Sequence, residues 1–291
     1  MKIKMLRKVN LILLILGALL LTNCSKEIPI NLPPYIEKIV VNGLMSDLEG
    51  SLVKISKSKS STDTNNINAI TNASVQLYTE NNQLFEVLTY NSFESGYKGS
   101  KLALPGSSYT IKVLYQNFEA TATTKIGTKT NLSNSIYIDS IGIDSSGFPL
   151  GELSFSFSDL GTEDNYYRLN VSYWDNSLKI FAILNLDDNF FINTQSEKTK
   201  NGYVFSDRTF SGVTQTLKFT VPFGFVAIGG DYKFLISLQT LNNDFTKYER
   251  SRELYNNAIN SPFAEPVFIY SNIKGGLGIF GGSSLSRDTL K

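Results

Sequence analysis

The stretch PGSSYTIKVLY, residues 105–115, decides the fold class of this chain. Pro105 and Gly106 open a polar turn, and apolar side chains then occupy alternate positions at Tyr109, Ile111 and Val113. A period of two residues is typical of a β-strand that buries one face. The sequence therefore predicts a strand over residues 109–115, followed by a returning strand over residues 117–125.

The same alternation continues toward the N-terminus. It predicts short strands over residues 36–43, 51–56, 73–78 and 84–90, with turns or polar loops between them. Short strands that follow one another at roughly ten-residue intervals indicate a β-sandwich. We assign this sandwich to residues 35–127. The order of its elements resembles the immunoglobulin-like, prealbumin-like modules of bacterial surface proteins.

The second half, residues 128–291, is predicted to be a separate β-rich domain with one helix. Alternation predicts strands over residues 152–158, 165–174, 178–186, 216–221 and 232–241. Residues 244–258 instead show helical spacing in one stripe of side chains, which are Phe245, Tyr248, Arg252, Tyr255 and Ile259. We expect this helix to dock on a sheet and to be committed to the fold. The predicted fold class is mostly β.

Cys24 is the only cysteine in the chain, and it follows a basic and then an apolar segment. The apolar stretch Leu11–Leu21 is well short of the ~20 residues that span a bilayer core. Residues 1–23 are therefore predicted to be a signal peptide. Residues 21–24 resemble a lipobox, from whose preferred pattern Asn23 departs. Cys24 is thus the predicted lipidation site, which would hold the protein at a membrane, and residues 24–34 form a tether. An ordinary signal peptide with an incidental cysteine is the alternative.

The composition excludes several classes of function. The chain has no histidine, which removes Ser-His-Asp and Cys-His nucleophilic sites and zinc held by histidine. The net charge is only +1, and the basic residues do not cluster in a stripe along the sequence. A nucleic-acid partner is therefore not expected. We predict a protein that is not an enzyme and that works by recognition, with no cofactor and no metal site.

Several stretches admit both a functional and a structural interpretation. Residues 185–189 place oxygen side chains at alternate positions, as a calcium loop does, but the glycine and distal glutamate of an EF-hand are missing, which favours a polar turn. Residues 165–167 and Trp174 could form an aromatic platform for a sugar, although a sheet-core role is favoured. The glycines of residues 275–282 favour close backbone approach around a last strand over a phosphate loop. The polar loop 57–68 is a better candidate for partner contact than the helix, and a merely mobile loop is the alternative.

Several segments in order resemble the Bacteroidota lipoprotein family called Domain of Unknown Function 4249. They are the lipobox cysteine, KIVVNGL (38–44), TNASVQLY (71–78), EDNYYRL (163–169), SPFAEP (261–266) and SNIKGGLGIFGG (271–282). The resemblance implies a lipid-anchored outer-membrane protein of the cell envelope, with its periplasmic or surface orientation open. It further implies an accessory role beside a TonB-dependent uptake transporter as partner. A structural or adhesive surface protein, including a carbohydrate-binding one, is the alternative.

Overall fold

The computed structural model describes residues 34–60, 63–147, 149–175, 180–184, 189–194, 196–199, 201–222, 232–259, 261 and 264–290. Residues 37–291 belong to one compact unit. Strands dominate the described residues of this unit, and they form one sheet of thirteen strands and one of three. The predicted mostly-β fold class is confirmed.

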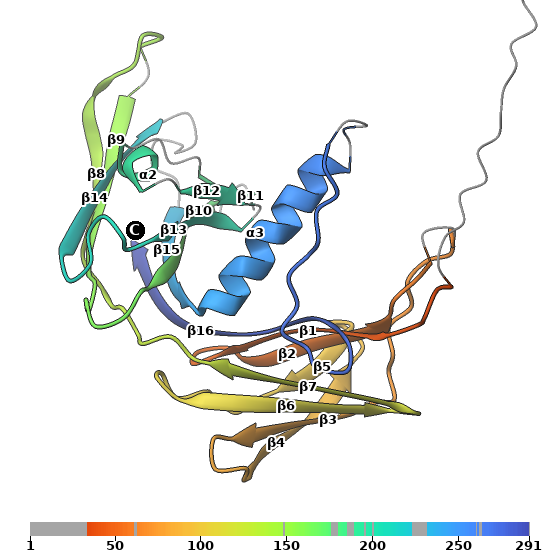
Figure 1. Cartoon of the computed structure of the whole chain (residues 1–291). Coiled ribbons are helices and arrows are strands. Elements are labelled where there is room, and N and C mark those ends of the chain that lie inside the picture. Colours follow the sequence, from red (N-terminus) through yellow and green to blue (C-terminus); the bar gives the residue numbers. More distant parts are fainter. Residues whose placement is uncertain are drawn as a thin grey trace, which may run out of the picture. The chain divides into compact units, whose positions relative to one another are not determined.

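Seven strands build the N-terminal half around one apolar core (Figure 1). The turn at residues 105–107 leads into the pair β6 and β7, in which Ile111 faces Ala122. The predicted inward positions Tyr109, Ile111 and Val113 are all buried. The strands are β1 (Ile39–Ser46), β2 (Gly50–Lys57), β3 (Ser74–Thr79), β4 (Leu84–Asn91), β5 (Gly96–Gly99), β6 (Ser108–Tyr115) and β7 (Phe118–Lys125).

The C-terminal half packs two sheets face to face. In the three-stranded sheet, order β14-β9-β8, the alternating Leu153, Phe155 and Phe157 are fully buried against Tyr167 and Phe234 of the larger sheet. The strands are β8 (Leu132–Ile143), β9 (Pro149–Ser158), β10 (Tyr166–Asp175), β11 (Ile180–Ile183), β12 (Glu197–Thr199), β13 (Gly202–Ser206), β14 (Thr214–Pro222) and β15 (Tyr232–Leu241).

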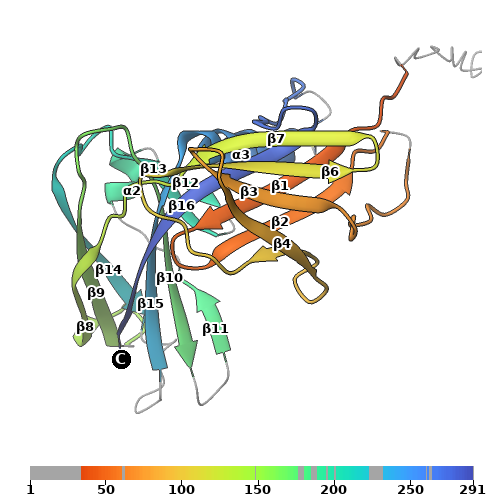
Figure 2. The ribbon, with the colours of Figure 1, turned by 90° about the horizontal axis from the view of Figure 1, so that it is seen from below.

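The last strand, β16 (Leu277–Leu290), joins the two halves into one sheet. It pairs with β15 in antiparallel fashion and with β1 in parallel fashion, so the order β15-β16-β1-β2 is continuous (Figures 1 and 2). The predicted boundary between domains at residue 127 stays a prediction. Strand pairing nevertheless crosses it, because the first and the last strand of the chain are neighbours in one sheet.

The helix predicted over residues 244–258 is confirmed as α3 (Asn243–Ala258). Its N-cap is Asn242, whose side-chain oxygen accepts a hydrogen bond from the Phe245 amide at 3.1 Å, as N-caps do. The predicted stripe is wrong in its second half, because Tyr255 and Ile259 are exposed. The buried positions are Phe245, Thr246 and Glu249. The expectation of one helix is also corrected, since a short α2 covers Asn189–Asn193.

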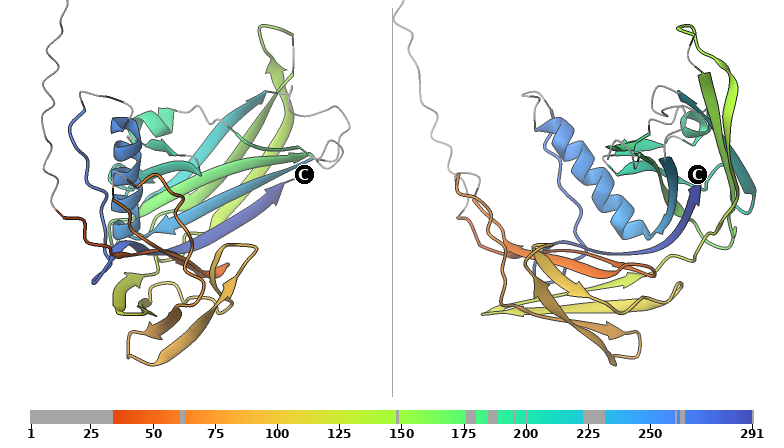
Figure 3. Two further views of the ribbon diagram at one scale, coloured as in Figure 1. Left: turned by 90° about the vertical axis from the view of Figure 1, so that its right-hand side faces the viewer. Right: turned by 180° about the vertical axis from the view of Figure 1, so that it is seen from behind.

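The helix lies on the opposite face of the sheet from the three-stranded sheet (Figure 3). Phe245 packs with Tyr166, Leu241 and Ile279 in a small third core. The chain then runs back along α3, and the Tyr270 amide donates to Ser251 Oγ at 2.8 Å. These contacts place α3 beside the ends of β10, β16 and β1, where the candidate site lies.

Candidate functional site

A groove of about 880 Å³ lies between α3 and the strands β1 and β2. It combines apolar, polar and charged walls. Phe245, Tyr248, Glu249 and Arg252 line it from α3, whereas Arg168 enters from β10. The wall from β1 and β2 consists of Asn42, Gly43, Leu44, Ser46, Gly50, Ser51, Leu52 and Lys54.

Arg168 is in the groove because of strand alternation. Its neighbours Tyr167 and Leu169 point into the core between the two sheets, so the side chain between them must point to the opposite face, toward α3. Arg168 is only 6% exposed. Its cross-strand neighbour in β15 is Gln239, whose Oε1 accepts a hydrogen bond from Nη1 at 3.3 Å.

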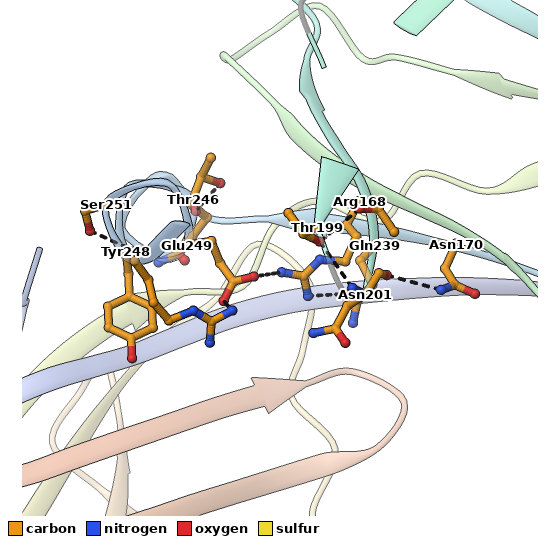
Figure 4. Close-up of polar contacts among 12 residues, drawn as sticks. Arg168, Asn170, Thr199, Asn201, Gln239, Thr246, Tyr248, Glu249 and Ser251 are labelled. Carbon is orange, nitrogen blue, oxygen red and sulfur yellow. Dashed lines mark hydrogen bonds and ion pairs between the residues drawn. The ribbon is translucent and has the colours of Figure 1, made fainter. Parts of the chain in front are cut away.

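Glu249 balances the charge of Arg168 from the helix (Figure 4). Arg168 Nη2 lies 2.6 Å from Glu249 Oε2, and both side chains are buried. The other oxygen, Oε1, lies 2.9 Å from Nη2 of Arg252, one turn further along α3. One carboxylate therefore holds two guanidinium groups, and the triad of Arg168, Glu249 and Arg252 carries a net positive charge.

Aromatic rings complete the surroundings of both arginines. Arg168 Cζ lies 5.4 Å from the centre of the Phe245 ring, and Arg252 Cζ lies 5.8 Å from that of Tyr248. Both distances allow cation–π attraction. Tyr248 also donates to Asn42 Oδ1 at 3.2 Å, which ties the helix to β1 across the groove.

Burial shifts the proton equilibria of the site. Desolvation lowers the pKa of Arg168, Arg252 lowers it further, and Glu249 opposes both effects. An arginine pKa starts so high that the group stays protonated at neutral pH. Desolvation likewise raises the pKa of Tyr248, which stays a neutral hydroxyl. Among described residues, Arg168 Nε has no hydrogen-bond partner, so the triad leaves one buried donor unsatisfied.

The rim of the groove adds further charges. Lys98 pairs with Glu94, and Glu49 pairs with Arg287. In the described part of the chain, Lys54 forms no ion pair, although it lines the groove. The groove therefore offers positively charged and hydrogen-bonding groups beside the apolar side chains of Leu44, Leu52 and Phe245, an arrangement suited to holding a polar ligand.

A second polar cluster lies at the start of β10 and belongs to the fold. Asp159 accepts hydrogen bonds from the Tyr167 hydroxyl and from the Gly212 amide. Asp207 accepts from the Asn165 amide at 2.8 Å, and burial raises the pKa of Asp207. Because these carboxylates bind backbone amides of neighbouring turns, they fix the entry into β10 rather than a ligand.

The segment EDNYYRL (163–169) thereby receives a structural explanation. Glu163 pairs with Lys125 at 2.7 Å, and Asn165 bridges the two aspartates. Tyr166 and Tyr167 are buried, which confirms their sheet-core role, whereas Trp174 is partly exposed.

The glycine-rich segment 275–282 is likewise explained by close backbone approach. A Cβ on Gly281 would lie 2.4 Å from the Phe245 ring, and one on Gly278 would lie 2.2 Å from the Val41 carbonyl. Gly278 also has a positive φ of 107°. The predicted structural role of these glycines around the last strand is confirmed.

The remaining candidates from the sequence are placed as follows. Cys24 and the signal peptide lie outside the described residues, as do Asp187 and Asp188 of the calcium-like segment. The loop 57–68 borders a polar hollow of about 470 Å³, and its residues 61 and 62 are outside the description. Within the described ranges, acidic residues form no cluster that could hold a metal. The helices described there are too short or too polar to span a lipid bilayer.

Sequence reasoning missed the groove and its triad. A local signal existed, because Arg168 interrupts the aromatic and apolar run of β10, and Glu249 falls between Phe245 and Arg252 of the helix. Neither signal shows that the two side chains meet, since they are 81 residues apart.

Comparison with known protein families gives a match over nearly the whole chain. The model of a family described as Domain of unknown function (DUF4249) matches residues 25–289. No curated protein matches the chain.

Proposed function

The chain belongs to the DUF4249 family, and from this premise we propose that it is a lipid-anchored binding protein of a Bacteroidota cell envelope. The groove between α3 and β1–β2 is its recognition site. The observation that carries the proposal is the buried triad of Arg168, Glu249 and Arg252 at a groove of about 880 Å³. That volume falls in the range of roughly 300–1,000 Å³ that small ligands occupy.

The chemistry of the groove supports recognition over turnover. Its most buried acid, Glu249, is held by two arginines, so its oxygens are already engaged as fixed partners of the two guanidinium groups. The chain also lacks histidine, the side chain that titrates near neutral pH without perturbation. Fixed charges beside a few apolar side chains would select a ligand without transforming it.

A blocking variant tests the groove. Leu52→Trp places a large ring in the groove, and Leu84→Trp, at an exposed position on β4, is the matched control. The probes are a panel of amino acids, dipeptides, and mono- and oligosaccharides at millimolar concentration. At least one probe should raise the melting temperature of the wild type and of Leu84→Trp, because binding to the native state stabilises it. An equal rise in Leu52→Trp would place the ligand elsewhere.

The lipid anchor is tested separately in cells. Wild-type protein should incorporate an alkyne analogue of palmitate and remain in the membrane fraction after a salt wash. Cys24→Ser should lose both properties, because several acyl chains are needed for stable anchoring. Membrane retention of Cys24→Ser after the wash would contradict lipidation at this residue.

The accessory role requires a partner in the outer membrane. Affinity purification of the tagged wild-type protein from detergent-solubilised outer membranes should yield a TonB-dependent transporter. Recovery of surface polymers or of further copies of the chain alone would support the structural or adhesive alternative.

A further inference from the structure

The charges that line the groove between α3 and β1–β2 do not cancel. Each carboxylate that lines it is already paired with a cation. The pairs are Glu94 with Lys98, Glu49 with Arg287, and Glu249 with both Arg168 and Arg252. The first two pairs are neutral, whereas the triad keeps one positive charge. Lys54 is exposed and, among the described residues, forms no ion pair. The groove therefore holds two positive charges that lack a counter-charge.

A row of contacts connects these two charges across the groove. The register of β1 and β2 sets Asn42 directly opposite Lys54, so their side chains are neighbours on one face of the sheet. Asn42 Oδ1 accepts a hydrogen bond from Tyr248, whose ring points from α3 toward the sheet (Figure 4). The guanidinium of Arg252 lies beside that ring. Lys54 and Arg252 therefore border the same part of the groove, one from the sheet and one from the helix.

Arg252 presents the surplus charge of the triad to a ligand. Its side chain is 39% exposed, whereas that of Arg168 is 7% exposed. Glu249 contacts Arg252 through the single nitrogen Nη2. A guanidinium carries five N–H donors in a planar fork, so this contact does not use up the donors of Arg252. Arg252 can therefore bind a second carboxylate while Glu249 stays in place.

The walls of the groove favour a carboxylate over a phosphate. Phosphate groups are typically held by free backbone N–H groups of loops or helix N-termini. Here β1 lies between β16 and β2, and β2 lies between β1 and β5, so the walls present side chains and not a row of free amides. A lysine and an arginine can bind the two oxygens of one carboxylate. Leu44 and Leu52, which face each other across the same two strands, add an apolar contact for the rest of an organic molecule.

We infer that the groove binds a small organic molecule through its carboxylate, which Lys54 and Arg252 hold from opposite sides while Leu44 and Leu52 contact its apolar part. The inference rests on the proposed function, because it names the ligand class of the same groove. Two kinds of molecule carry such a carboxylate, namely peptides with a free C-terminus and acidic sugars.

Each source is tested with an acid and its neutral counterpart. The peptide probes are N-acetyl-leucyl-leucine and its C-terminal amide. The sugar probes are trigalacturonic acid and its methyl ester. Phenyl phosphate is the probe for a phosphate in place of the carboxylate. Isothermal titration calorimetry at low ionic strength measures the affinity of the full mature chain for each probe.

Two charge variants and two matched controls identify the binding groups. Lys54→Gln and Arg252→Gln each remove one positive charge from the groove. Lys233→Gln, on β15, and Arg208→Gln, in the turn after β13, remove exposed charges elsewhere, and neither residue lines the groove. All four variants should fold, because none of the substituted side chains is buried. Circular dichroism checks this.

At least one of the two acids should bind to the wild type and to both controls. Its affinity should fall at least tenfold in Lys54→Gln and at least tenfold in Arg252→Gln. The neutral counterpart should likewise bind the wild type at least tenfold more weakly than the acid does. Added salt should weaken binding of the acid, because salt screens exposed charges. The acid that binds identifies the source of the carboxylate.

Several results would overturn the inference and leave the proposed function standing. They are equal affinity for an acid and its neutral counterpart, equal affinity of the wild type and both charge variants, and tighter binding of phenyl phosphate than of either acid, provided that Leu52→Trp abolishes the binding observed. Failure of both acids, together with a neutral probe that stabilises the wild type but not Leu52→Trp, has the same meaning. Absence of binding by every probe would contradict the inference and the proposed function together.

Discussion

Arg168 illustrates how one buried residue links the sheet to the helix. Taking a guanidinium out of water costs several kcal/mol, which attraction to a partner offsets only when the geometry is good. Glu249, Gln239 and the face of Phe245 supply that geometry. The pair also commits α3 to one position on the sheet, because the helix must present Glu249 to a fixed point on β10.

Removal of the Glu249 side chain should lower the stability of the protein far more than removal of the Arg252 side chain. Glu249→Ala leaves Arg168 buried without its charge partner, and we expect a loss of about 3–5 kcal/mol in the free energy of unfolding. Arg252 is 39% exposed, so Arg252→Ala should cost under ~1 kcal/mol. Urea denaturation followed by circular dichroism measures both.

A double substitution separates two contributions to the free energy of unfolding. One is the cost of leaving Arg168 without a charge partner, and the other is the stabilisation by the Arg168–Glu249 ion pair itself. Arg168→Met combined with Glu249→Leu replaces the pair by apolar side chains, and its stability should lie within ~2 kcal/mol of the wild type. A double variant as unstable as Glu249→Ala would show that the pair itself, and not the orphaned charge, carries the effect.

Glu163 should make stability depend on pH in the acid range. Hydrogen bonds from Lys125 and Thr128, and the charge of Lys125, lower the pKa of Glu163, although slight burial opposes them. A carboxyl whose pKa is lower in the folded state adds stability above its unfolded pKa and loses it as pH falls. The melting temperature of Glu163→Gln should therefore lie slightly below that of the wild type at pH 7. The difference should disappear between roughly pH 5 and pH 3. A difference that persists at pH 3 would contradict this explanation.

At the scale of elements, the contact between α3 and β16 depends on the absence of side chains. Gly281 lies under the Phe245 ring, so the helix approaches the strand more closely than any larger residue would allow. The same closeness brings Glu249 within reach of Arg168. The glycines thus determine the position of the helix and, through it, the width of the groove.

Gly281→Val should destabilise the protein by about 1–3 kcal/mol, because overpacking displaces the Phe245 ring. Combining it with Phe245→Ala should cost less than the sum of the two single substitutions, since the smaller side chain removes the clash. Thermal denaturation of the four proteins gives this comparison. Additive losses would mean that the two residues do not compete for space.

Substitution of Tyr248 tests which part of α3 contributes to the stability of the fold. The sequence places it in a buried stripe, for which large-to-small changes cost roughly 2–4 kcal/mol. In the structure it is only partly buried and lines the groove, so Tyr248→Ala should cost about 1–2 kcal/mol. Tyr255→Ala, at an exposed position on the same helix, should cost under ~0.5 kcal/mol. Equal losses in urea denaturation would contradict this assignment.

At the scale of the whole unit, β16 is the element on which both halves depend. It lies between β15 and β1, and its residues Ile279, Phe280 and Leu285 are buried in the cores. Losing three such side chains, at about 3 kcal/mol each, would remove most of the ~5–15 kcal/mol that stabilises a typical protein.

A chain that ends after Gly276 should therefore not fold cooperatively. Replacing the loop 57–68 by a short Gly/Ser linker should leave the cooperative transition in place, because most of its described residues are exposed. Differential scanning calorimetry tests both. A cooperative transition in the shortened chain would show that the N-terminal half folds without β16.

The sequence by itself determined most of the strands, their inward faces and the extent of the helix, whereas β5, β8, β12 and β13 were not predicted. Alternation in residues 109–115, 153–157 and 167–173 matched the buried positions because strand periodicity depends only on local geometry. Composition likewise excluded sites that require histidine, because the chain contains none. The tertiary structure alone decided that β16 pairs with β1, that Arg168 meets Glu249, and that Tyr255 stays exposed. Each of these depends on contacts between residues far apart in the chain, or on which part of a helix touches the sheet. No local pattern encodes such distances, because strand order and helix position follow from the packing of the whole unit.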